Sequence, residues 1–119
     1  MHRRVAFLLL LVIGCSKPPE ADQLRKAVVS WSSSLAMTAQ YWRIGQVPDR
    51  FVKTVTEGAV DELGNQSRSS QAIAPALTRA AAGTIALAHE LDDAVEHHDR
   101  SAAARNEQEL DAIARDLRQ

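Results

Sequence analysis

Hydrophobic residues recur along most of this chain at alternating steps of three and four, the spacing of one face of an α-helix. The first stripe consists of Leu24, Val28, Trp31, Leu35, Thr38 and Trp42. The segment 18–22 suits a helix start, because proline is accepted in the first turn and acidic side chains there complement the helix dipole. Gly45, with Pro48 just beyond, suits a left-handed helix stop. These features predict a first helix that ends at Gly45.

A second, shorter helix is predicted from about Pro48. Its stripe consists of Phe51, Val55, Ala59 and Leu63. Gly64 and Asn65 are expected to end it, and the polar run 64–70 to form a loop.

The most regular periodicity follows, in a third helix predicted from near Ser70 that accepts Pro75 close to its start. Its stripe consists of Ile73, Leu77, Ala80, Thr84, Leu87, Leu91, Ala94 and His98. Asp99, Arg100 and Ser101 are N-cap candidates for a fourth helix. Its weaker stripe consists of Ala103, Leu110, Ile113 and Leu117. The alternative is that the third and fourth helices form one long kinked rod.

These patterns predict an all-α fold over residues 20–119, because no segment after residue 15 alternates with the two-residue period of a strand. Four amphipathic helices with mostly short connections favour an up-down-up-down bundle. Trp31, Trp42 and Phe51 are expected in its core, facing the small residues 80–83. A ligand groove lined by the two tryptophans is the alternative.

The first 14 residues have a different pattern. His2, Arg3 and Arg4 precede an unbroken apolar run over 5–13. A basic head, a short apolar middle and small residues at the exit are the three parts of a secretory signal. The run is too short for a bilayer, which takes about 20 apolar residues. A cleaved signal peptide over 1–14 is therefore predicted.

Val12, Ile13, Gly14 and Cys15 resemble the lipobox of bacterial lipoproteins. The resemblance implies a diacylglycerol thioether on Cys15, cleavage just before it, and acylation of the freed amine, commonly with palmitate. The alternative is an ordinary signal followed by an incidental cysteine. Cys15 is the only cysteine, so a disulfide within the mature monomer is excluded.

The resemblance also implies a location. In lipoproteins of Gram-negative bacteria an Asp after the lipidated cysteine favours the inner membrane, and this chain has Ser16 there. The expected site is therefore the periplasmic face of the outer membrane. Residues 15–19 form a tether that spans less than about 20 Å, so the domain must lie close to the bilayer.

The mature chain has 12 basic and 15 acidic residues, a formal charge of −3, because Arg3 and Arg4 leave with the signal. Nucleic acid as a partner is disfavoured, since it requires a basic face. The sequence predicts no enzyme, because no nucleophile with a general base and no phosphate-binding loop is visible.

One stretch, 89–99, could support chemistry. Its acidic patch consists of Glu90, Asp92, Asp93 and Glu96. His89, Asp93 and His97 follow at steps of four, so all three can lie on one side of a helix. Imidazole with carboxylate suits zinc, copper or nickel, although three turns span about 12 Å and one ion cannot reach all three ligands. We therefore expect a solvated acidic helix end, with a metal site as the alternative.

The sequence thus predicts a lipid-anchored helical interaction or structural module of the cell envelope, with no cofactor besides the lipid and with an envelope protein as partner. A metal-responsive or pH-responsive periplasmic binding protein that uses residues 89–99 is the alternative, because its histidines titrate between about pH 5 and 8.

The lipobox gives a direct test. Cys15→Ser should leave an uncleaved precursor without lipid, because the thiol is the acceptor of the diacylglycerol and cleavage follows its transfer. Intact-mass spectrometry of the membrane fraction measures both changes. A lipid-free mature chain that starts at another residue in the wild type would contradict the lipoprotein interpretation.

Overall fold

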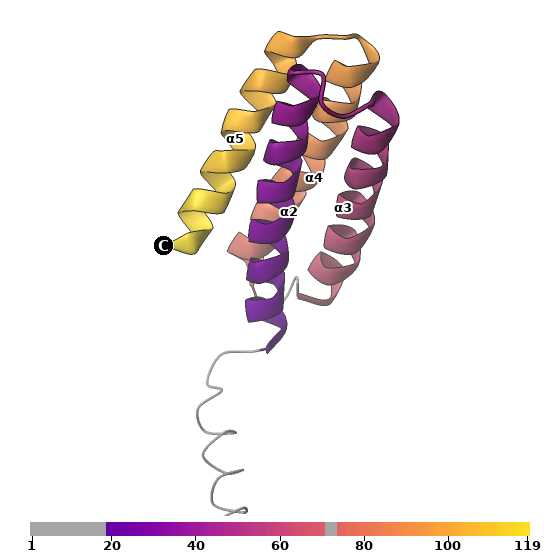
Figure 1. Cartoon of the computed structure of the whole chain (residues 1–119). Helices are drawn as coiled ribbons and strands as arrows, with labels where there is room; N and C mark the ends of the chain where they lie inside the picture. The colour runs from indigo at the N-terminus through magenta and orange to yellow at the C-terminus, as the bar shows by residue number, and fades with distance from the viewer. Residues whose placement is uncertain (1–18, 71–73) are drawn as a thin grey trace, which may run out of the picture.

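The computed structural model describes the backbone of residues 19–70 and 74–119, so the predicted signal peptide, Cys15 and Ile73 lie outside the described residues. The described chain forms four helices, α2 (Pro19–Arg43), α3 (Asp49–Ser70), α4 (Pro75–Glu96) and α5 (Arg100–Arg118). Successive helices run antiparallel (Figure 1), which confirms the all-α, up-down-up-down bundle. Within these ranges there is no strand, and no helix is long and apolar enough to cross a membrane.

The end of α2 confirms the stop predicted at Gly45. Gly45 has a φ of +76°, in the left-handed region. Its amide donates to the carbonyl of Trp42 (3.0 Å), and the next amide, that of Gln46, donates to the carbonyl of Tyr41 (2.8 Å). This pair of bonds is the Schellman motif, which satisfies two carbonyls that the helix itself leaves free.

The loop predicted over residues 64–70 is wrong, because α3 continues to Ser70. Gly64 lies inside the helix and does not have a positive φ. The serines that follow bond to the helix's own carbonyls: Ser67 Oγ lies 3.3 Å from the carbonyl oxygen of Gly64, and Ser69 Oγ 3.1 Å from that of Gln66. Ser70 is buried at the end of the helix. A polar composition therefore did not end the helix here.

The predicted core stripe of α3 is also partly wrong. Phe51 is 46 % exposed and Val55 only half-buried. The buried stripe is Val52, Thr56, Ala59 and Leu63. Thr56 is tolerated in the core because its hydroxyl donates a hydrogen bond to the carboxylate of Asp92 (Oγ1 to Oδ1, 2.7 Å).

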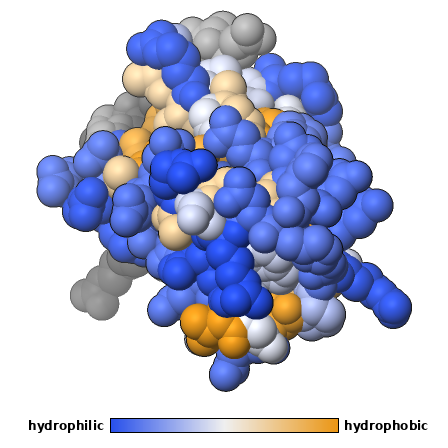
Figure 2. Space-filling view, turned by 90° about the horizontal axis from the view of Figure 1, so that it is seen from above, coloured by the Kyte–Doolittle hydropathy of each residue, from blue (hydrophilic) through white to orange (hydrophobic). Residues whose placement is uncertain are grey.

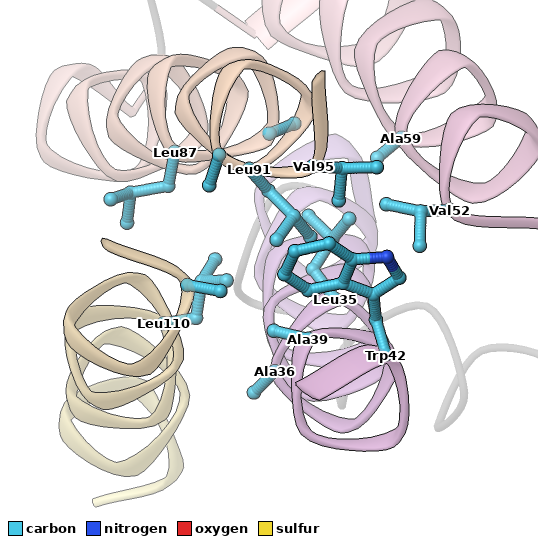
Figure 3. Close-up of a cluster of buried hydrophobic side chains, with 13 residues drawn as sticks. Leu35, Ala36, Ala39, Trp42, Val52, Ala59, Leu87, Leu91, Val95 and Leu110 are labelled. Atoms are coloured by element: carbon cyan, nitrogen blue, oxygen red, sulfur yellow. The ribbon is translucent and has the colours of Figure 1, made fainter. Parts of the chain in front are cut away.

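The core consists of two packed clusters between the helices. The larger one lies toward the end where α4 meets α5, with Leu35, Trp42, Leu91 and Leu110 among its members (Figure 3). The smaller one is formed by Leu24, Val28, Leu63 and Ala81.

Both tryptophans contact α3, and Trp31 also packs against the smaller core cluster, which includes Ala81, so the predicted facing of residues 80–83 holds only in part. A Cβ on Gly58 would lie 3.1 Å from the ring edge of Trp31, so this indole occupies the space that glycine leaves. Trp31 Nε1 donates to Glu62 Oε2 (2.9 Å), and Trp42 Nε1 donates to Asp49 Oδ1 (2.8 Å). Gly83 instead lies close to Ile113 of α5.

Helix α2 contacts all three other helices, whereas among the described residues α3 and α5 do not pack on each other. Of the two diagonal pairs of helices, α2 and α4 therefore lie closer together than α3 and α5. Ser32 and Thr84 meet on that diagonal with their hydroxyl oxygens 3.0 Å apart, and both are fully buried.

Two glycines with opposite roles test the helix ends. Gly45→Ala should lower the free energy of unfolding by about 1 kcal/mol, because a Cβ is unfavourable in the left-handed region. Gly64→Ala should raise it by about 0.5–1 kcal/mol, because Gly64 is helical and a Cβ there meets only Arg68 Nη1 at 3.7 Å. Urea unfolding followed by circular dichroism measures both. Destabilisation by Gly64→Ala would contradict the continuous helix α3.

Candidate functional site

The predicted acidic stretch lies at the far end of the bundle, opposite the end at which α2 begins (Figure 1). Seen from above, this end is mostly hydrophilic, with hydrophobic areas at the lower edge and in the upper part of the view (Figure 2). We define the far end as the last two turns of α4, the turn over 97–99 and the first three turns of α5.

The turn between α4 and α5 is tight, which excludes the single kinked rod. His98 has a φ of +52°, and it is the one non-glycine residue in the described ranges with a positive φ. Its amide donates to the carbonyl of Val95 (3.1 Å), and the amide of Asp99 donates to the carbonyl of Ala94 (2.8 Å). This is again the Schellman geometry, with a histidine in the place that glycine usually takes.

Asp99 begins α5, as predicted for an N-cap. Its side-chain oxygen accepts a hydrogen bond from the amide of Ala102 (3.0 Å). The carboxylate thus satisfies one of the free amides at the helix start and complements the helix dipole. The short turn and the cap together fix the direction in which α5 leaves α4.

A polar groove runs between α4 and α5 at this end. Its lining residues are Glu90, Asp93, Ala94, His97, Asp99, Ala102, Arg105, Asn106 and Glu109. Four carboxylates thus face one guanidinium and one imidazole, so the groove carries an excess of negative charge. Such a surface favours cationic groups.

Asn106 is a groove residue that sequence reasoning missed. It is only 3 % exposed, and its Nδ2 donates to the main-chain carbonyl of Leu87 (2.7 Å). Its Oδ1 is buried without a hydrogen-bond partner within the described part of the chain. The sequence signal was its position in the α5 stripe, between Ala103 and Leu110, where a polar residue is unusual.

The four acids of the predicted patch do not lie on one surface. Glu90 and Asp93 line the α4–α5 groove. Asp92 and Glu96 instead line a second groove, toward α3, together with Asp49, Arg50 and Lys53. The larger excess of negative charge therefore lies on the α5 side of α4.

Asp92 is the acidic residue most strongly tied to the core. Burial raises the pKa of this carboxyl above its ordinary value of 3.8, while the hydrogen bond from Thr56 and the nearby charges of His89 and Lys53 oppose the shift. The charge of Glu57 adds to the rise of this pKa. Asp92 thus connects α4 to α3 and is less available than its neighbours to a partner.

The predicted metal ligands are separated in part. Asp93 and His97 line the same groove, and His97 Nδ1 lies 2.8 Å from the main-chain oxygen of Asp93. His89 is exposed and lines neither groove described above. In the described ranges, no three His, Cys, Asp or Glu side chains are grouped closely enough to hold an ion. Metal binding stays a prediction that solution measurements must decide.

Comparison of the chain with protein-family models, curated proteins and solved structures finds no match. The geometry and charge of the molecule itself are therefore the basis for its proposed function.

The raised pKa of Asp92 predicts a pH dependence of stability. The folded state keeps the proton of Asp92 to a higher pH than the unfolded state, so this group's contribution to stability declines as the pH rises from 3.8 through the raised pKa. Asp92→Asn should remove that decline, since the amide oxygen can still accept the hydrogen bond from Thr56. Urea unfolding across the acidic range measures it.

Asp93→Asn is the matched control, because it removes the same charge from the exposed side of the helix. A change common to both variants is an effect of net charge. If Asp92→Asn retains the wild-type profile, burial of this carboxyl does not affect stability.

Proposed function

We propose that this protein is a lipid-anchored interaction module of the cell envelope, held by Cys15, whose α4–α5 groove docks a basic surface of another envelope protein. The proposal rests mainly on one observation: the groove lies at the end of the bundle opposite the start of α2. A lipid on Cys15 places the start of α2 at the bilayer, because only four residues separate Cys15 from Glu20. The groove then projects into the periplasm, where a partner can reach it.

The charge of the groove supports a basic partner. Glu90, Asp93 and Glu109 are exposed, whereas Asp99 is already used as a helix cap. Exposed charges steer the encounter and contribute to specificity more than to final affinity. The proposal thus predicts an association that weakens as the salt concentration rises. Arg105, the one arginine in the groove lining, is then available to pair with an acidic group of the partner.

In this proposal the membrane anchor and the docking groove are at opposite ends of the bundle. The lipid provides membrane attachment without a sequence-specific protein contact, and two or more acyl chains hold firmly. The bundle is then free to present one surface at a nearly fixed height above the membrane. The proposed location is the periplasmic face of the outer membrane.

The test neutralises three groove acids in the tagged full-length protein, as Glu90→Gln, Asp93→Asn and Glu109→Gln. After chemical cross-linking in intact envelopes, quantitative mass spectrometry should show at least one co-purified envelope protein reduced about tenfold, which corresponds to about 1.4 kcal/mol. The reduction should be larger in low salt than in high salt, because screening weakens surface electrostatics.

The control removes the same number of charges outside the groove, as Glu57→Gln, Asp111→Asn and Asp116→Asn. These three side chains are exposed on α3 and α5. The control should retain the partner, and both variants should unfold near the wild-type temperature. Equal loss in both variants would mean that net charge, not the groove, attracts the partner. No loss in the groove variant would exclude the groove as the docking surface.

A further inference from the structure

After Lys26, the outward face of α2 differs in charge from the other helix surfaces, whereas Arg25 and Lys26 in its earlier turns are exposed. Residues 27–42 contain no Asp, Glu, Lys, Arg or His, the longest such run in the chain. The exposed faces of the other helices do carry charge, including Lys53, Glu57 and Asp61 on α3, Arg79 and Glu90 on α4, and Arg105, Asp111 and Arg115 on α5. A solvent-facing helix surface normally carries charged side chains opposite its apolar stripe.

The exposed large hydrophobic residues are also concentrated there. In the described ranges these are Met37 (54 % exposed), Tyr41 (40 %), Ile44 (59 %) and Phe51 (46 %). Three of the four lie on α2 or directly after its last turn. Single exposed hydrophobic residues are ordinary, but a group on one face is typical of an interaction surface.

The spacing of these residues is that of a coiled-coil seam. Ser30, Ser34, Met37, Tyr41 and Ile44 follow at steps of four, three, four and three. All five are exposed. We call this set the outer seam of α2, because the buried residues Val28, Leu35 and Trp42 lie on the opposite side of the helix. Helix α2 therefore has two stripes, of which the bundle covers only one.

We propose that the outer seam of α2 pairs with the same seam of a second copy of this chain, in a parallel two-fold dimer. In a two-fold interface a surface meets itself, so a charge near the axis would face a like charge. The outer seam avoids that repulsion because none of its five residues is charged. A charged partner protein would gain no ion pair from such a surface, whereas an identical uncharged seam fits it.

The parallel direction rests on the proposed lipid anchor. Two copies attached to one membrane present the starts of their α2 helices at the same height. In parallel pairing each seam residue meets its own counterpart. The small Ser30 and Ser34 allow close approach near the membrane, and Met37, Tyr41 and Ile44 provide the apolar contact farther out.

The size of the seam predicts a weak dimer in free solution. The seam from Ser30 to Ile44 spans about 21 Å of helix, and one helix against one helix falls at the small end of protein interfaces. Attachment of both copies to one membrane raises their effective concentration, which favours association without any added contact. Pairing should therefore be stronger in membranes than after detergent extraction.

Cysteine cross-linking in the full-length protein tests the pairing. Ile44→Cys and Met37→Cys are introduced singly and oxidised with copper phenanthroline in native membranes. Disulfide-linked dimers should form several-fold more with both variants than with Ser101→Cys, an exposed control at the far end on α5. A disulfide requires Cα atoms within about 7 Å, so random collision gives little product. The wild type measures any product formed through Cys15.

The outcomes separate the arrangements. Cross-linking of Met37→Cys without Ile44→Cys would mean antiparallel pairing and would overturn the parallel dimer. Equal product in the Ser101→Cys control, a product that is not twice the monomer mass, or no product would overturn self-pairing through α2. Adding Tyr41→Glu to Ile44→Cys should reduce the dimer several-fold, since it places like charges face to face; a thermal unfolding curve checks that this variant folds.

The cross-linking test is independent of the groove experiment. The neutralised groove variant changes α4 and α5 only, so a failed partner capture leaves the cysteine cross-links unaffected. If Cys15 carries no lipid, the same cysteine variants at high concentration in detergent-free solution still report whether the seams pair in parallel.

Discussion

The close approach of α2 and α4 across the middle of the bundle determines the rest of this structure. Small residues make it possible, since Ser32 and Thr84 are fully buried where the two helices meet. The Thr84 hydroxyl donates to the carbonyl of Ala80 in its own helix (3.0 Å), and the 3.0 Å contact between the two hydroxyls gives Ser32 a partner in the core. Helices α3 and α5 then fill the two sides of this diagonal without packing on each other within the described chain.

The packing of α2 on α4 also determines which helix surfaces remain exposed to solvent. Helix α2 turns its buried stripe toward α4 and is flanked by α3 and α5, so its outer seam faces solvent, as do Gln23, Arg25, Lys26 and Gln40. Helix α4 is flanked in the same way, and its acidic end is therefore divided between two grooves. Asp92 is used in packing against Thr56 of α3, whereas Glu90 and Asp93 remain open on the α5 side. One acidic run in the sequence thus gives two surfaces of different charge.

Sequence periodicity predicted the helices well where buried residues are hydrophobic and less well where they are polar. The α2 stripe was correct, with Trp31 only partly buried, because large hydrophobic residues mark it, and the stop was correct because Gly45 adopts a left-handed φ. On α3 the steps of four, four and four from Phe51 drift around the helix, and the true stripe includes Thr56, whose hydrogen bond to Asp92 is not visible in one sequence. Asn106 was missed for the same reason, since its carbonyl partner lies on another helix.

The far end of the bundle is held in place by polar contacts between its helices. One polar contact joins each neighbouring pair of helices there: Trp42 with Asp49, Thr56 with Asp92, Leu87 with Asn106, and Arg43 with Glu107. These contacts form a ring around the larger core cluster. Preorganisation of this kind lowers the conformational entropy that a groove would lose on binding, which is one of the costs of association. Within the described chain the polar contact between α4 and α5 is made by the Nδ2 of Asn106 alone, which donates to the carbonyl of Leu87, since the Oδ1 is buried without a hydrogen-bond partner.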